Sequence, residues 1–207
     1  MKRGFTVVEL VVVIVVIAIL ASIVAVSYSN HLVETNDNAR RASVQQIEQA
    51  VSQLRLRRDS IIMMGGYYPS GAAPDSDGFC VYNGTYTNTS STGSNWVNYS
   101  STSSNYRCTL GSMLIATKVV ASDFFDDIPE NKEYTTEARK KDAAMVYYRC
   151  DTTNTRWILY YYLEKPTAEE TASIDSFTAG CPSISTTLVN NLKSNLKMKA
   201  AIDIKLN

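Results

Sequence analysis

A long apolar segment near the amino terminus constrains the fold more than any other feature of this chain. From Leu10 to Val26 there are 17 residues without a charge, and Ser22 is the only polar one. About 20 apolar residues in a helix span the hydrocarbon layer of a membrane. Lys2 and Arg3 precede the segment, and basic residues are typical of the cytoplasmic side. We therefore expect a cytoplasmic N-terminus, with the chain after Val26 outside.

Three interpretations of this segment are open. An ordinary secretory signal has a basic start, a short apolar region and a small-residue cleavage site, for which Ala25-Val26-Ser27 could serve. A plain transmembrane anchor is the second interpretation. Both leave Glu9 unexplained, because a carboxylate in lipid costs about 2–3 kcal/mol and usually marks a function.

The third interpretation accounts for the carboxylate. Gly4 followed by Phe5, with Glu9 four residues later and then an apolar helix, resembles the prepilin signal of type IV pilins and type II secretion pseudopilins. The resemblance implies that prepilin peptidase cleaves after Gly4, that the new amino group of Phe5 is methylated, and that the helix stays on the mature protein. In that family the Phe5 cation and Glu9 carboxylate of neighbouring subunits pair during assembly, which suits an apolar setting where an unpaired charge is expensive.

The helical pattern continues well beyond the apolar segment. No Pro or Gly occurs between Phe5 and Met64, and Gly65-Gly66 is a strong stop signal. A helix of about 60 residues would be about 90 Å long, which suits a rod that carries a small head on its second half. Apolar residues at helical spacing predict one buried face on that half: Val44, Ile47, Ala50, Val51 and Leu54.

A polar segment rich in Tyr, Ser, Thr and Asn follows the long helix at residues 65–108. Its start, Gly66-Tyr67-Tyr68-Pro69, resembles the exit of the long helix in pilins related to the major pseudopilin. Aromatic loops of this composition occur in binding surfaces such as antibody paratopes. An ordinary exposed loop whose aromatics pack back onto the head is the interpretation that we favour.

The remainder of the chain predicts a small α+β head. Residues 110–117 read as a short helix, and 145–163 as a β-hairpin whose second strand resembles the last strand of the pseudopilin sheet. Residues 196–206 alternate apolar and polar, which predicts an added strand that covers a sheet edge. The expected fold is a disulfide-bonded pilin fold in which a long helix packs on a small antiparallel sheet. The expected segments are 1–4 leader, 5–26 transmembrane or filament-core helix, 27–64 outer half of the helix, 65–108 loop, 109–182 head and 183–207 tail.

The four cysteines all follow the apolar segment and lie in no close C-x-x-C pair, so disulfides are favoured over a zinc site. Three connectivities are open. We expect Cys80–Cys108, which would hold the polar loop, and Cys150–Cys181, which resembles the disulfide-bounded loop of many pilins.

An acidic group precedes the hairpin: Asp123, Asp126, Asp127 and Glu130. Major pseudopilins hold calcium in a loop of this neighbourhood, and calcium prefers several oxygen ligands. The spacing matches no known calcium loop closely. A solvated acidic turn is therefore preferred, and no metal or other cofactor is expected.

Catalysis and nucleic-acid binding find little support in the sequence. His31 is the only histidine, and no nucleophile, zinc or phosphate-binding motif occurs. Lys plus Arg and Asp plus Glu are both 20, and this balance gives no general attraction to nucleic acid. Arg55, Arg57 and Arg58 form a basic end to the rod, for which pairing with neighbouring subunits or solvation is expected.

These observations predict a prepilin that is a structural subunit of a type IV pilus-like surface filament. Its expected partners are other pilin subunits, prepilin peptidase and the inner-membrane assembly machinery. A single-pass location in the cytoplasmic membrane, followed by an extracellular filament, is expected. A type II secretion pseudopilin or a DNA-uptake pilin is the alternative, and an anchored or secreted protein of another function is a remote one.

Overall fold

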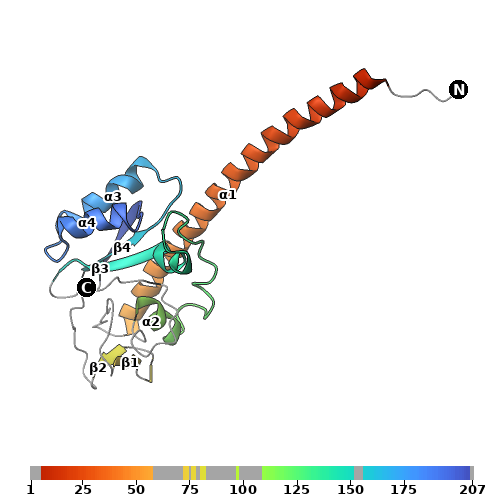
Figure 1. The fold of residues 1–207 in the computed structure, drawn as a ribbon. Coiled ribbons are helices and arrows are strands. Elements are labelled where there is room, and N and C mark those ends of the chain that lie inside the picture. The colour runs from red at the N-terminus through yellow and green to blue at the C-terminus, as the bar shows by residue number, and fades with distance from the viewer. Residues whose placement is uncertain are drawn as a thin grey trace.

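The computed structural model describes residues 6–57, 72–74, 76–77, 80–82, 97, 109–151 and 156–205. Its longest element is α1 (Val7–Arg57), a helix of 51 residues that starts as a free rod and ends inside the head (Figure 1). The helix is uninterrupted because this stretch contains no Pro or Gly. The predicted continuation to Met64 lies outside the described residues.

A three-stranded antiparallel sheet forms the centre of the head. Its strands are β3 (Met145–Arg149), β4 (Arg156–Tyr161) and β5 (Ala200–Lys205), in the order β3-β4-β5. The β3–β4 pair lies within the predicted hairpin range 145–163. A separate antiparallel pair joins β1 (Ala72–Pro74) to β2 (Cys80–Tyr82).

Helices cover both faces of the three-stranded sheet (Figure 1). The outer half of α1 and the short helix α2 (Leu110–Ala116) share one hydrophobic core with one face. Helices α3 (Ala168–Thr178) and α4 (Thr186–Ser194) pack on the other face. The side chains divide between the faces by strand alternation. The α1 side includes Tyr147, Trp157, Leu159, Tyr161 and Ile204, whereas the α3 side includes Val146, Ile158, Tyr160 and Ala201.

The face of α1 that packs on the sheet is the one that the apolar spacing predicts. Val44, Ile47 and Leu54 are each at most 3% exposed. The long helix and the small antiparallel sheet of the expected fold class are therefore confirmed.

The tail differs from the predicted strand 196–206. Strand β5 spans only Ala200–Lys205, because α4 extends to Ser194 and the chain then turns. Lys197 has φ 57°, a left-handed conformation that cannot continue a strand. Leu196 and Met198 instead pack in the core beneath α3 and α4. The strand pairs with β4, as expected for a strand that covers a sheet edge.

Short capped elements connect these parts. Thr109 caps α2, Ser185 caps α4, and Thr167 with Glu170 forms a capping box at the start of α3. Two short 3-10 helices, η2 (Glu137–Arg139) and η3 (Asp142–Ala144), lead into β3. Helices α3, α4, η2 and η3 were not predicted from the sequence.

Candidate functional site

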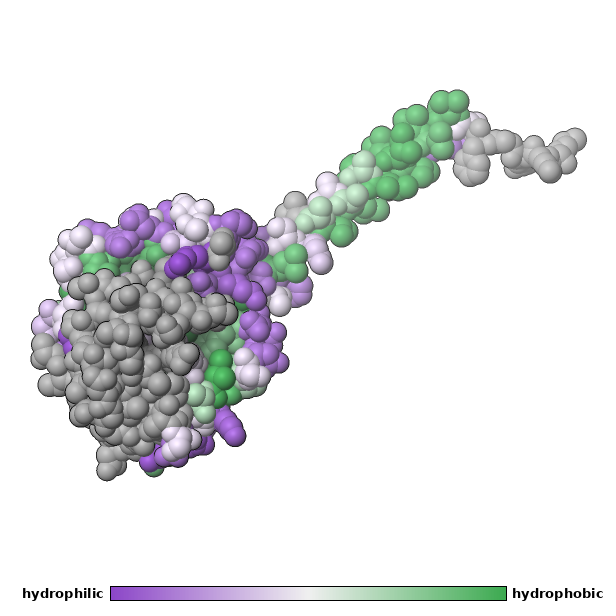
Figure 2. Space-filling model, turned by 60° about the horizontal axis from the view of Figure 1, so that its bottom comes forward, coloured by the Kyte–Doolittle hydropathy of each residue, from purple (hydrophilic) through white to green (hydrophobic). Residues whose placement is uncertain are grey.

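The free part of α1 is an apolar rod that the head does not cover. Figure 2 shows it as a hydrophobic projection from the head, whose coloured surface in this view is largely hydrophilic. Large apolar side chains from Val7 to Val24 are exposed, and none of the most apolar 18-residue window is buried. Length and composition make α1 able to cross a membrane. A fully exposed apolar helix is unfavourable in water, so this segment fits membrane anchoring.

The Glu9 carboxylate, at the start of this rod, accepts hydrogen bonds from a residue of the same helix turn. The backbone N–H and the hydroxyl of Thr6 each donate to Glu9 Oε2 at 2.8 Å, and the Glu9 N–H donates to Thr6 Oγ1 at 3.2 Å. This reciprocal arrangement is a capping box, in which Thr6 is the N-cap of α1. The pair lies at the exposed start of the helix. The Glu9 carboxylate therefore has its hydrogen bonds within its own chain.

Gly4 and Phe5, the predicted cleavage and methylation residues, lie outside the described residues. The structure therefore leaves their roles as predictions. The capping box was not predicted from the sequence, although the pattern Thr6-x-x-Glu9 is a known helix-start signature.

A buried ion pair fixes the head to α1. Arg40 and Asp37 are 0% and 1% exposed, and Arg40 Nη1 lies 2.7 Å from Asp37 Oδ1. Arg40 also donates to the carbonyl oxygens of Pro129 at 3.2 Å and Glu130 at 2.6 Å. Its guanidinium lies 4.8 Å from the ring centre of Tyr162. Arg40 thus joins a carboxylate of its own helix to two backbone carbonyls of the head.

Asp37 completes the same contact from the helix side. Its carboxylate accepts the backbone N–H of Glu164 at 2.9 Å and that of Lys165 at 2.7 Å. The Glu164 carboxylate lies 3.5 Å from Arg40. We call Asp37, Arg40 and Glu164 the docking cluster. Nothing in the local sequence pattern indicated it, because the partners lie some 90–128 residues apart.

A second ion pair lies beside the docking cluster. Arg41 Nε lies 2.6 Å from Glu170 Oε1 at the start of α3. The hydrogen bond from Arg41 holds the pKa of Glu170 below its ordinary value, and the hydrogen bond to Glu170 raises the pKa of Arg41. The capping contact with Thr167 further lowers the pKa of Glu170. Helix α3 is therefore oriented on α1 by a charged pair and a cap that share one carboxylate.

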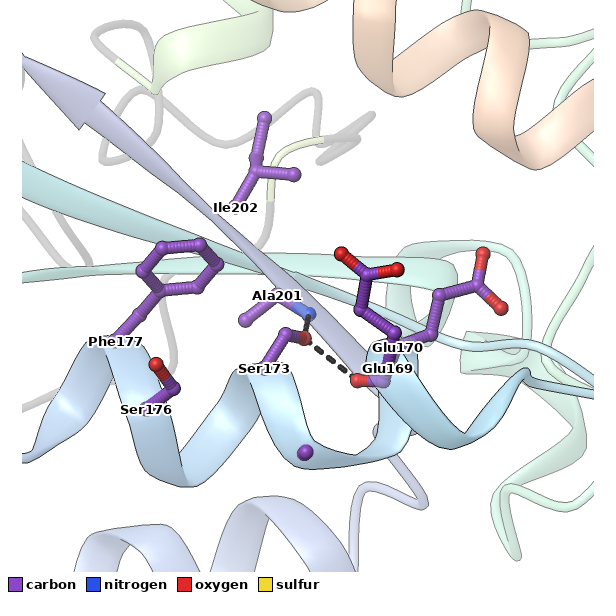
Figure 3. A pocket seen from close by; sticks show the side chains of 8 residues that line it. Glu169, Glu170, Ser173, Ser176, Phe177, Ala201 and Ile202 are labelled. Atoms are coloured by element: carbon purple, nitrogen blue, oxygen red, sulfur yellow. Dashed lines mark hydrogen bonds between the residues drawn. The ribbon is translucent and has the colours of Figure 1, made fainter.

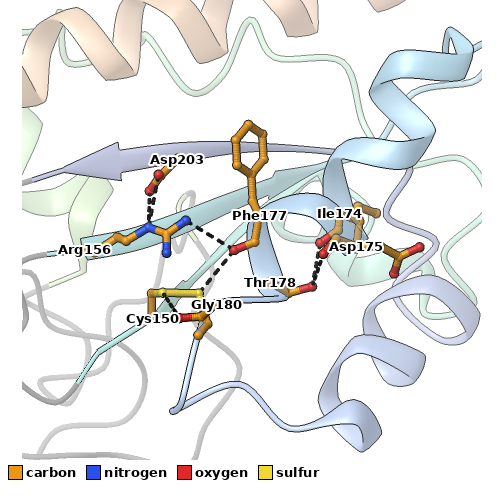
Figure 4. The surroundings of a disulfide bond; sticks show 9 residues. Cys150, Arg156, Ile174, Asp175, Phe177, Thr178, Gly180 and Asp203 are labelled. Atoms are coloured by element: carbon orange, nitrogen blue, oxygen red, sulfur yellow. Dashed lines mark hydrogen bonds and ion pairs between the residues drawn. A yellow bond between two sulfur atoms is a disulfide. The ribbon is translucent and has the colours of Figure 1, made fainter.

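The carboxyl-terminal end of α3 is held by a disulfide. Cys150 and Cys181 are joined, as the family resemblance implied (Figure 4). Arg156 lies next to the bond and donates to the Phe177 carbonyl at 3.4 Å and to Asp203 at 2.9 Å. The predicted Cys80–Cys108 disulfide stays a prediction, because Cys108 and the side chain of Cys80 lie outside the described part of the chain.

The basic end of the rod contacts its own head. Arg55 donates to the Lys205 carbonyl at 2.8 Å, and Arg57 donates to the Thr117 carbonyl at 2.9 Å. Arg57 nevertheless stays exposed and Arg55 half-buried. The expectation that these residues stay solvated or pair with neighbouring subunits therefore remains a prediction. Arg58 lies outside the described residues.

The weak calcium candidates belong to no cluster of metal-binding side chains in the described residues, and the preference for a solvated acidic turn stays a prediction. Among these residues, no three His, Cys, Asp or Glu side chains gather closely enough to hold a metal. Asp123 and Asp126 lie in a turn, where the Asp126 N–H donates to the Asp123 carbonyl at 2.8 Å. The Glu130 carbonyl is engaged by Arg40. His31 lies exposed on α1.

Comparison with known proteins identifies the amino-terminal segment. Residues 1–25 match the family model of the prokaryotic N-terminal methylation motif. No curated protein and no solved structure gave a significant match. The matched residues contain Gly4, Phe5 and Glu9 and most of the exposed apolar rod. The amino-terminal segment therefore carries the prepilin-type signal that is the signature of type IV pilin and pseudopilin precursors.

Proposed function

We propose that this chain is a structural subunit of a type IV pilus-like surface filament. The observation that carries the proposal is the exposed apolar part of α1, continuous with a folded head and marked by the methylation motif. Such a helix is stable in lipid, and it can later bury the same side chains against copies of itself. Prepilin peptidase cleaves between Gly4 and Phe5 in this proposal, and Phe5 is the methylated residue.

Glu9 directs assembly in the proposed mechanism. Removal of residues 1–4 leaves a cation on Phe5, one residue before the capping threonine. The Glu9 carboxylate of one subunit then pairs with the Phe5 amino group of its neighbour, which fixes the axial position of the incoming helix. The Thr6 contacts support this proposal, because they keep the carboxylate hydrogen-bonded at the helix start until a neighbour arrives.

The Glu9→Ala variant tests the assembly step separately from processing. We expect intact-mass measurement to show a methylated Phe5 start in the parent and in the variant, because the Gly4–Phe5 bond is unchanged. The amount of subunit in sheared surface filaments is expected to fall at least tenfold in the variant. Glu34→Ala, which removes an exposed carboxylate farther along α1, is the matched control. A normal filament yield from Glu9→Ala would contradict the assembly role.

The mass measurement also tests the processing itself. A start near Ser27 in the native protein would indicate an ordinary secreted protein. An uncut chain would indicate a plain anchor. Either result would overturn the proposed function.

A further inference from the structure

Among the described residues, strand β5 forms one edge of the central sheet, because the strand order is β3-β4-β5. On the opposite edge, the Val97 N–H donates to the Met145 carbonyl at 3.2 Å. A sheet edge presents unpaired N–H and C=O groups to which another chain can add as a strand. Proteins that are held close together by a shared membrane meet this hazard more often than dilute proteins. The contacts at β5 therefore bear on how copies of this chain can associate.

Side chains from two helices occupy the two ends of the β5 edge. The Ala201 N–H donates to Ser173 Oγ of α3 at 2.8 Å (Figure 3). At the other end, Arg55 Nη1 of α1 donates to the Lys205 carbonyl at 2.8 Å. Alternate residues of a strand direct their backbone groups to the same side. The backbone N–H and C=O groups of Ala201, Asp203 and Lys205 therefore point away from β4. Hydrogen bonds hold the first and last of these three residues, Ala201 and Lys205.

A charge pair lies at the middle of the row. Arg156 Nε lies 2.9 and 3.0 Å from the two carboxylate oxygens of Asp203, and the Asp203 side chain is only 14% exposed (Figure 4). A charged residue placed inside an edge strand is a known protection against strand addition. Two copies that paired antiparallel about Asp203 would also set these carboxylates opposite each other, and like charges in that position destabilise the pair.

Two hollows lie along β5, between the strand and the helices α3 and α1. Phe177 of α3 separates two hollows along the strand, of about 390 Å³ and 400 Å³. The first is lined by Ser173, Ala201 and Ile202, and Figure 3 shows the Phe177 ring and Ile202 projecting on the same side. The second is lined by Arg55, Asp203 and Lys205. The contacts at both ends of β5 therefore lie beside space that α3 and α1 do not fill.

We infer that the Ser173–Ala201 and Arg55–Lys205 hydrogen bonds, together with the Arg156–Asp203 pair, close the β5 edge against strand addition by a second copy of this chain. We call these three the edge contacts. The inference does not rest on the proposed function, because it concerns the head alone.

The test compares two double variants of the full chain in detergent micelles. Ser173→Ala/Arg55→Ala removes two edge contacts. Ser176→Ala/Arg57→Ala is the control, because Ser176 lies one turn along α3 and Arg57 likewise binds a head carbonyl away from β5. Association is followed by native mass spectrometry over a hundredfold concentration range, and the exchange of the Asp203 amide is followed by NMR.

The edge variant is expected to dimerise with rising concentration, with at least tenfold slower exchange of the Asp203 amide in the dimer. The control and the parent are expected to show neither change. An edge variant that associates no more than the control overturns the inference. Association that leaves Asp203 exchange unchanged also overturns it, because the contact would then lie elsewhere.

A second measurement covers the case in which the double variant does not fold. The single variants Ser173→Ala and Arg55→Ala are then titrated with the blocked peptide Ala-Ala-Ile-Asp-Ile-Lys, which is the sequence of β5. Each single variant is expected to bind this peptide at least tenfold more tightly than the parent does. Equal binding by the parent and both variants overturns the inference.

Discussion

Lys118 holds a backbone conformation that is costly for lysine, with φ 59°. It follows the C-cap of α2, where its N–H donates to the Ile115 carbonyl and the Val119 N–H donates to the Leu114 carbonyl. This is the Schellman arrangement, in which Gly is the usual residue at the Lys118 position. The left-handed conformation costs a residue with a Cβ about 1–2 kcal/mol, and part of this is offset because Gly loses more entropy on folding.

We expect Lys118→Gly to raise the free energy of unfolding of the head by about 0.5–1 kcal/mol. The measurement is urea unfolding of the full chain in detergent, followed by the near-ultraviolet dichroism of the head. Lys118→Ala is the matched control, since it removes the same side chain but keeps the Cβ. Equal gains from Gly and Ala would show that the backbone conformation is not the cause.

Glu170 makes the stability of the head sensitive to acid. The hydrogen bond from Arg41 holds its pKa below the ordinary value, so the folded state binds this proton less readily than the unfolded state does. The stabilisation is present above the unfolded pKa of about 4.3 and is lost as the pH falls through the folded value. Glu170→Gln should therefore reduce the loss of stability between about pH 5 and pH 3.

Unfolding midpoints of the parent and of Glu170→Gln, measured at pH 7 and at several lower values, test this expectation. Glu169→Gln is the control, because Glu169 is the exposed neighbour on the same turn of α3. The parent and Glu169→Gln should lose stability together in acid. Parallel pH curves for all three proteins would assign the acid sensitivity to other groups.

At the scale of elements, the Cys150–Cys181 bond connects the end of β3 to the end of α3. It closes a loop with a sequence separation of 31 residues, which includes β4 and α3. In the chain-entropy model, a loop of this length corresponds to about 3–4 kcal/mol of stabilisation. The bond also lies beside Arg156, whose contacts with Phe177 and Asp203 join β4, α3 and β5.

We expect the Cys150→Ser/Cys181→Ser variant to have a free energy of unfolding about 3 kcal/mol lower than that of the parent. Amide exchange should accelerate most in α3 and β5, whose positions depend on the same corner of the head. Denaturant unfolding and hydrogen exchange by mass spectrometry measure both effects. A uniform increase in exchange that includes α2 would indicate a general loss of packing instead.

Elements with a strong local pattern were predictable from the sequence. The apolar face of α1, the Tyr- and Ile-rich strands β3 and β4, and the short helix α2 each show the periodicity of their structure. Helix α3 was missed because its apolar residues are few, with only Ile174 and Thr178 buried. Its capping box at Thr167 and Glu170 was the available signal. The start of β5 was misplaced because alternation continues through Leu196 and Met198, which pack in the core after a turn.

In the candidate site, too, residues in a short local pattern were predictable, whereas residues that depend on distant contacts were not. Gly4, Phe5 and Glu9 form a short local pattern, so the sequence alone indicated the prepilin-type signal. The docking cluster depends on contacts of Arg40 with carbonyl groups about 90 residues away. A buried Arg on a helix has no signature in its neighbours, because burial depends on how the chain returns to it.

At the scale of the whole molecule, the docking cluster connects the two functions of α1. The amino-terminal half of the helix is apolar and uncovered, whereas the carboxyl-terminal half is part of the core of the head. The cluster lies at the transition, where Asp37 is the first buried residue of α1 among those described. These residues form the first buried contact between α1 and the head, after the exposed hydrogen bond from Lys165 to Asn30.

Removal of Arg40 should therefore weaken the attachment of the whole head to the rod. Arg40→Ala leaves the Asp37 carboxylate buried without its cation and removes the donors to the Pro129 and Glu130 carbonyls. Breaking a buried pair from one side costs about 3–5 kcal/mol. We expect a loss of this size in urea unfolding, and faster amide exchange in α1 from Asp37 to Leu54. Exchange in the apolar half within the micelle should not change.

A double-mutant cycle decides whether the pair acts as a unit. The Asp37→Ala/Arg40→Ala protein should lose less stability than the sum of the two single variants, because each single variant leaves a buried charge without its partner. Arg57→Ala, which removes an exposed cation that binds one head carbonyl, should cost only about 1 kcal/mol. Additive losses in the cycle would mean that Arg40 and Asp37 hold the head independently, through their separate contacts with the loops at 129–130 and 164–165.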